Sequence, residues 1–124
     1  MTPAGLARYQ QVDVFTMTPE RRVLLLYGHL LLNLRQARSA LAAGDILARS
    51  VRTAKALDVL NELLFSLDRE QGGQLAERLA GIYVYLIGET TRADRERDAS
   101  RLDPVIEISA SLQEAWVSAA RAVE

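Results

Sequence analysis

His29 is the only histidine of this chain, and it lies between Gly28 and Leu30 in a stretch with a helical pattern. One histidine on a helix of a small bundle is the arrangement of a histidine phosphotransfer domain. Such a site needs an exposed imidazole with cationic and small residues nearby. The next turn holds three leucines, with no lysine or glycine. A phosphotransfer bundle that uses His29 is therefore the alternative hypothesis, and a histidine without a catalytic role is favoured.

Other reactive sites lack the residues that they need. A single histidine cannot supply the Glu-x-x-His pairs of a di-iron bundle, and zero cysteines exclude a disulfide, a zinc–thiolate site and a thiol nucleophile. Gly72-Gly73 has neither the spacing nor the Lys-Ser/Thr pair of a phosphate-binding loop. We therefore expect no enzyme, no catalytic residue, no metal and no cofactor.

Composition points to one globular domain of 124 residues. Apolar residues make up 49% and charged residues 25%, and the net charge of -1 gives no field that would attract nucleic acid or an anionic membrane. No apolar run approaches the roughly 20 residues that cross a bilayer, and no signal-peptide pattern is present. The absence of cysteine fits a reducing compartment. We expect a cytoplasmic protein that inserts into no membrane and binds no nucleic acid.

Thr18-Pro19-Glu20 marks the beginning of the first predicted helix. Threonine can cap it, proline loses no hydrogen bond at the first helical position, and the glutamate faces the positive end of the helix dipole. Gly44 ends the helix as a C′ residue. Between these signals apolar residues recur alternately four and three positions apart, as in helices packed in bundles; they are Val23, Tyr27, Leu30, Leu34, Ala37 and Leu41.

Asp45 is expected to cap the second helix, which runs to about residue 70. The segment 67–73 ends it and leads directly into the third helix, and so short a connection makes the two helices antiparallel neighbours. The predicted stripe of the second helix is Leu47, Val51, Ala54, Leu57, Leu60, Leu64 and Leu67, and that of the third is Leu75, Leu79, Ile82 and Leu86.

Asp98 or Asp103 could cap the last helix. Pro104 favours Asp103, because proline fits the first helical position and would kink a second turn. A short irregular lead-in then precedes the helix. Its apolar side is Leu102, Val105, Leu112, Trp116, Ala119 and Val123, with Trp116 interpreted as a core residue.

The prediction is an all-α fold, an antiparallel four-helix bundle with an N-terminal extension. Residues 1–124 form one domain, with a tail at 1–17 and helices at about 18–43, 45–70, 73–94 and 103–122. The first and third helices carry more apolar residues than one packing seam requires. This excess predicts a further hydrophobic interface, and a wide core or a homodimer contact would also explain it.

Taken in order, several short segments resemble the bacterial flagellin export chaperone family, FliS, over essentially the whole chain. They are Leu6 and Tyr9-Gln10, then Thr18-Pro19-Glu20 leading into Val23-Leu24-Leu25-Leu26-Tyr27, Gly44-Asp45-Ile46, Leu67-Asp68-Arg69-Glu70-Gln71-Gly72-Gly73, Tyr83-Val84-Tyr85 and Glu114-Ala115-Trp116. One departure follows Tyr27, where the family usually has Asp-Gly and this chain has Gly28-His29.

The resemblance implies a cytosolic export chaperone that binds the C-terminal helical region of flagellin, prevents premature polymerisation and delivers flagellin to the flagellar type III export gate. In the family the N-terminal tail lies over part of the groove, so Leu6 and Tyr9 would compete with flagellin. Tyr83 and Tyr85, two positions apart on a helix, cannot face the same side. The expected flagellin-binding residues are Leu6, Tyr9, Leu24, Tyr27, Leu31, Tyr83, Tyr85 and Ile87.

Overall fold

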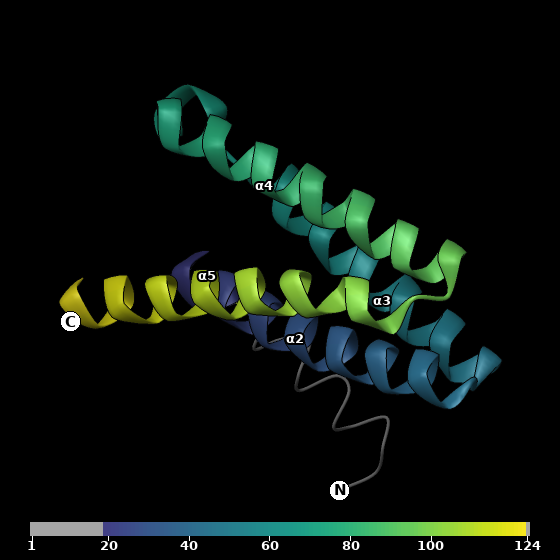
Figure 1. Cartoon of the computed structure of the whole chain (residues 1–124). Helices are drawn as coiled ribbons and strands as arrows, with labels where there is room; N and C mark the ends of the chain where they lie inside the picture. Colours follow the sequence, from purple (N-terminus) through teal and green to yellow (C-terminus); the bar gives the residue numbers. More distant parts are fainter. Residues whose placement is uncertain (1–18, 124) are drawn as a thin grey trace, which may run out of the picture.

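The computed structural model describes residues 19–123, and in this part of the chain every regular element is helical. Four α-helices pack against one another, as predicted (Figure 1). A 3₁₀ turn, η1, precedes the last of them. The helices are α2 (Pro19–Ala43), α3 (Ile46–Phe65), α4 (Arg69–Glu96) and α5 (Leu102–Val123), and η1 spans Ala99–Arg101.

The turn between α2 and α3 has the predicted chemistry. Gly44 adopts a positive φ of 72°, which glycine reaches without the steric cost that a Cβ would bring. Asp45 then caps α3, because its carboxylate accepts a hydrogen bond from the backbone N–H of Ala48 at 3.1 Å. The two helices are therefore joined by a tight turn and run antiparallel.

The corner between α3 and α4 lies earlier in the chain than predicted. α3 ends at Phe65, not near residue 70, because Asp68 caps a new helical turn by accepting a hydrogen bond from the backbone N–H of Gln71 at 3.1 Å. α4 therefore starts at Arg69, not at residue 73. Gly73 interrupts it with φ 53° and ψ −130°, a conformation that glycine tolerates. We call the end of the bundle that carries this corner the Asp68 end.

The predicted lead-in to α5 is present as η1, and Asp98 is the residue that caps it. The Asp98 carboxylate accepts a hydrogen bond from the backbone N–H of Ser100 and starts η1, which continues into α5 at Leu102. Asp103 is therefore in the first turn of α5 and is not its cap, and it forms an ion pair with Arg38 of α2. Pro104 follows within that first turn, where its missing N–H removes no helical bond.

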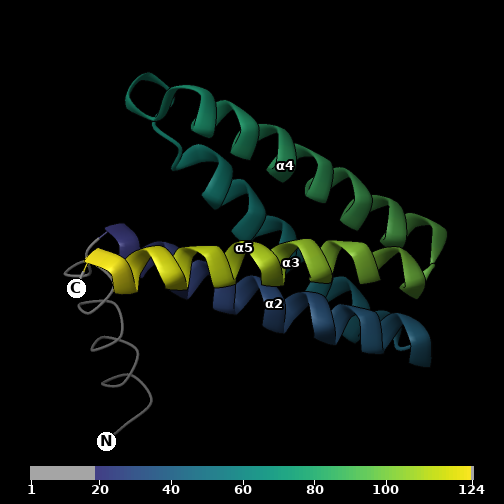
Figure 2. The same ribbon diagram turned by 60° about the vertical axis from the view of Figure 1, so that its left-hand side comes forward.

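The core is built around α2, which packs on both α3 and α5, while α4 packs mainly on α3. α4 and α5 touch less than the other neighbouring pairs. Figures 1 and 2 show why: the two helices meet at their connection and diverge toward the Asp68 end. Buried residues of α5 follow the same trend, because Leu102, Val105 and Ser109 are buried and no residue at 110–122 is.

Two predicted stripes are displaced from the observed core. In α3 the core face is Thr53, Ala56, Leu60 and Leu63, whereas Leu47 and Val51 of the predicted stripe are exposed. In α4, Leu79 and Leu86 are buried as expected, but Leu75 is exposed. Near the ends of these helices, then, an apolar stripe continues past the point where a neighbouring helix covers it.

Candidate partner-binding groove

An apolar groove lies at the Asp68 end, where α4 and α5 separate. We call it the corner groove. Each of the four helices contributes to it, as does the corner between α3 and α4. Its lining residues are Val23 of α2, Leu63 of α3, Ser66, Leu67 and Asp68 of the corner, Gly72, Leu75, Ala76, Leu79 and Tyr83 of α4, and Trp116 of α5.

The groove offers apolar surface that this part of the chain leaves uncovered. Leu75 on α4 is 64% exposed, while Leu63 and Leu79 are buried. Trp116 on α5 is partly buried and packs against the core. An exposed leucine beside a half-covered tryptophan and a buried apolar floor suits a partner that inserts apolar side chains.

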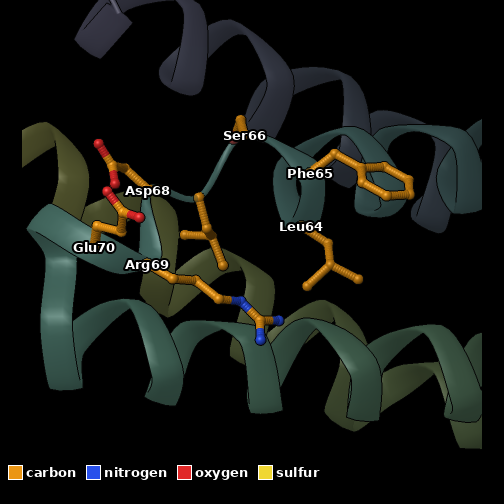
Figure 3. Close-up of a pocket in the computed structure, with 7 residues that line it drawn as sticks. Leu64, Phe65, Ser66, Asp68, Arg69 and Glu70 are labelled. Carbon is orange, nitrogen blue, oxygen red and sulfur yellow. The ribbon is translucent and has the colours of Figure 1, made fainter.

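A second hollow lies at the same corner, lined by residues 64–70, and shares Ser66, Leu67 and Asp68 with the corner groove. Figure 3 shows the carboxylates of Asp68 and Glu70 on one side of it and the ring of Phe65 on the other. Phe65 is among the most exposed apolar side chains of residues 19–123. The apolar surface of the Asp68 end therefore continues outside the groove, beside a charged rim.

A pair of tyrosines lies deep in the bundle and links the groove to the core. The hydroxyls of Tyr27 on α2 and Tyr83 on α4 are 2.6 Å apart and form a buried hydrogen bond. Burial raises the pKa of both tyrosines, and the hydrogen bond to Tyr83 raises that of Tyr27 further. Tyr83 therefore reaches from the groove into the core, where Tyr27 holds it.

The tyrosine pair predicts a loss of stability at high pH. Both hydroxyls ionise less readily in the folded chain than in the unfolded chain. Above a pH of about 10 the unfolded state then binds fewer protons, and the free energy of unfolding falls by about 1.4 kcal/mol per pH unit for each tyrosine. Denaturant unfolding from pH 7 to 11 measures this slope.

The double variant Tyr27→Phe/Tyr83→Phe is the test of that slope. It keeps both rings and removes both buried hydroxyls, so its unfolding free energy should fall less with pH than that of the wild type. The single variant Tyr85→Phe is the control, because Tyr85 is about half exposed. An unchanged slope in the double variant would contradict the role given to this pair.

The predicted partner-binding residues fall into different environments. Tyr27, Leu31 and Tyr83 are buried, and of these only Tyr83 lines the groove. Leu24 and Ile87 are partly buried, with Ile87 packed against the core, while Tyr85 faces outward. As the spacing predicts, Tyr83 and Tyr85 face different sides. Leu6 and Tyr9 lie outside the described residues.

His29 is an exposed residue of α2. The amide nitrogen of the Asn33 side chain donates to the backbone carbonyl of His29 at 2.8 Å. This contact involves only the backbone of His29. Among residues 19–123, no three His, Cys, Asp or Glu side chains gather as they would around a metal ion.

Five of the eleven groove residues belong to apolar stripes that the sequence predicts as core: Val23, Leu67, Leu75, Leu79 and Trp116. A stripe cannot show that the helices on either side of it diverge. The clearest sequence signal was the corner at 67–73, which brings Leu67 and Leu75 to one end of the bundle.

Comparisons with known proteins agree with this architecture. The sequence profile of the family "Flagellar protein FliS" matches residues 2–123. The flagellar secretion chaperone FliS of Vibrio cholerae is 31% identical over 116 residues, covering 90% of this chain and 85% of that protein. The FliS chaperone of Salmonella typhimurium is 30% identical over 120 residues, covering 93% and 89%.

A solved structure supports the same fold. A crystal structure of a flagellar chaperone from bacteria superposes with a TM-score of 0.78 and covers 95% of this chain and 96% of that one, at 18% identity. Among the described residues, no helix is both long and apolar enough to cross a membrane. The family acts by binding and not by catalysis. The family profile covers nearly the whole of this chain, and two relatives are about 30% identical to it. This chain therefore belongs to the FliS family of flagellar secretion chaperones.

Proposed function

We propose that this chain is a cytoplasmic chaperone for flagellin. It binds the C-terminal helical region of newly made flagellin, prevents premature polymerisation, and delivers flagellin to the export gate of the flagellar type III secretion apparatus. The observation that carries the proposal is the corner groove, an apolar surface that residues 19–123 leave uncovered in a chain that belongs to the FliS family.

Flagellin presents the matching chemistry. A segment that packs between subunits of a filament must be apolar on at least one side, and it is prone to associate before export. An amphipathic helix can place that side into a groove between helices, with anchors at helical spacing. Leu75, Leu79 and Trp116 would contact those anchors from two sides of the groove. Ordering of the flagellin segment would oppose part of the gain from burial.

The burial of each predicted residue decides whether it would contact flagellin directly or support the residues that do. Tyr83 would form part of the groove floor, with Tyr27 holding it from behind by the hydroxyl hydrogen bond. Tyr85, Leu24 and Ile87 are the predicted residues with surface left for direct contact. Leu31 is 3% exposed, so its part in binding is to support the core beneath the surface.

The N-terminal tail would regulate access to the groove. Val23, one turn after the start of α2 at Pro19, lines the groove, so α2 begins at the Asp68 end. Leu6 and Tyr9 are close enough along the chain to return to it. Replacing both by alanine should then strengthen flagellin binding, and a weaker or unchanged affinity would contradict competition by the tail.

Isothermal titration calorimetry tests the proposal. The full chain is titrated with a C-terminal flagellin fragment from the same organism at several temperatures. We expect one-to-one binding with a negative heat-capacity change, because apolar surface leaves water on both partners. A fragment from the central, non-helical part of the same flagellin is the control. No heat and no co-elution at tens of micromolar would contradict the proposal.

A further inference from the structure

The middle of α4 presents a second apolar surface, on the side away from the corner groove. Val84 and Tyr85 are each at least half exposed, and neither lines the groove. Figures 1 and 2 both show α4 along the outer edge of the bundle, with one side free of other helices. This surface lies outside the corner groove, although Tyr85 is also one of the residues predicted to contact flagellin.

The residues around Val84 and Tyr85 are arranged symmetrically along the helix. Gly81 and Gly88 lie three residues to either side of this pair, and Glu77 and Arg92 lie seven residues to either side. With about 3.6 residues per turn, all six positions fall on one face about 100° wide. Each of the six is exposed. We call this face the α4 outer face.

The two glycines leave room for another backbone. Both lie within regular helix, where glycine is less favourable than alanine. A Cβ built at Gly81 or Gly88 would meet no atom within 4 Å, so no neighbour in the described chain requires a glycine there. Small residues at such positions allow two helices to approach closely.

Among residues 19–123, the two charged side chains of this face form only exposed ion pairs. Glu77 lies 3.8 Å from Arg69, and Arg92 lies 3.3 Å from Glu96; all four side chains are well exposed. Exposed pairs of this kind contribute little to stability. Glu77 and Arg92 therefore remain able to exchange these contacts for better ones.

We propose that the α4 outer face binds the same face of a second copy, with the two α4 helices antiparallel about a two-fold axis between Val84 and Tyr85. Glu77 of each copy then faces Arg92 of the other, Gly81 faces Gly88, and Val84 faces Tyr85. Such an isologous contact closes as a dimer. A parallel pair would instead place like charges together, so charge complementarity selects the antiparallel arrangement.

The dimer should be weak and should leave the corner groove open. The contact runs from Glu77 to Arg92, about 22 Å of one helix, and is smaller than the roughly 800 Å² per partner of a typical stable interface. We expect a dissociation constant of tens to hundreds of micromolar. Leu79 and Tyr83 face the bundle, so each copy keeps its own groove.

Sedimentation equilibrium of the full chain across a wide concentration range tests the proposal. The mass should rise from the 13.7 kDa monomer toward twice that value. The variant Glu77→Arg places an arginine opposite Arg92 of the second copy at both ends of the contact. The repulsion should weaken association at least tenfold. The double variant Glu77→Arg/Arg92→Glu restores opposite charges and should restore the dimer. Glu114→Arg, an equal charge change at an exposed position of α5, is the control.

The variants separate this interface from other forms of association. Replacing Gly88 by glutamine should also abolish the dimer without harming the fold, because space is open at that position. A monomer at every concentration would overturn the proposal. So would a dimer that Glu77→Arg leaves unchanged, or one that the double variant fails to restore. Circular dichroism of each variant checks that the helical fold is intact where the dimer is lost.

Discussion

Leu75→Glu should weaken binding of the flagellin fragment by more than tenfold and leave the fold intact. Leu75 is exposed at the rim of the corner groove, so its replacement costs the free chain little, about 0.5 kcal/mol or less. In the complex the leucine side chain would be buried, which is worth about 1.5 to 3 kcal/mol, and a carboxylate there would also lose water. Calorimetry measures the affinity, and thermal unfolding measures the stability.

Leu47→Glu is the matched control for this change. Leu47 is 77% exposed, somewhat more than Leu75 at 64%, but it lies in the first turn of α3, at the opposite end of the bundle. The same substitution there should leave flagellin binding within about twofold of the wild type. Equal loss in both variants would mean that binding depends on general surface hydrophobicity and not on the corner groove.

The second large effect is expected in the core. Leu31→Ala should lower the free energy of unfolding by about 2 to 5 kcal/mol, because Leu31 is almost fully buried and its truncation leaves a cavity. Domains of this size are stable by only about 5 to 15 kcal/mol, so the variant should unfold at clearly lower denaturant concentration. Urea unfolding followed by circular dichroism measures the change.

Leu32→Ala tests the orientation of α2 at the neighbouring position. Leu32 is 53% exposed, and its loss should change the free energy of unfolding by well under 1 kcal/mol. A similar cost for the two variants would contradict the rotation of α2 in this structure, and with it the assignment of Leu31 to the core.

The turn between α2 and α3 could be predicted because its signals are local: Gly44 and Asp45 act through their own backbone conformation or through a hydrogen bond within one turn. Asp68 acts in the same local way, but the prediction does not include it as a cap and therefore places the end of α3 and the start of α4 too late in the chain. Asp98 was recognised as one of two candidate caps, and the choice of Asp103 was wrong because η1 supplies a second short helical start. Four packed helices follow directly from such signals.

The groove could not be predicted in the same way, because it depends on the angle between helices. The spacing of Leu75, Leu79 and Leu86 is the same whether or not α5 covers all three. In the structure α5 diverges from α4, so Leu86 is buried, Leu79 forms a groove floor and Leu75 is exposed. A single sequence contains no measure of that divergence.

The orientation of the aromatic side chains could be predicted only in part. The spacing of Tyr83 and Tyr85 shows that they face different sides, but it does not say which faces inward. The hydroxyl of Tyr27 decides this, because it meets Tyr83 in the core at 2.6 Å. Trp116 was expected to lie in the core and is partly buried at the groove.

Fluorescence of Trp116 tests the central claim, that flagellin occupies the corner groove, most directly. It is the only tryptophan of the chain, and it lines the groove. Titration with a tryptophan-free flagellin C-terminal fragment should shift its emission to shorter wavelength and protect it from acrylamide quenching, saturating at one fragment per chain. Binding that calorimetry detects but that leaves the emission and quenching of Trp116 unchanged would place flagellin elsewhere and contradict the account.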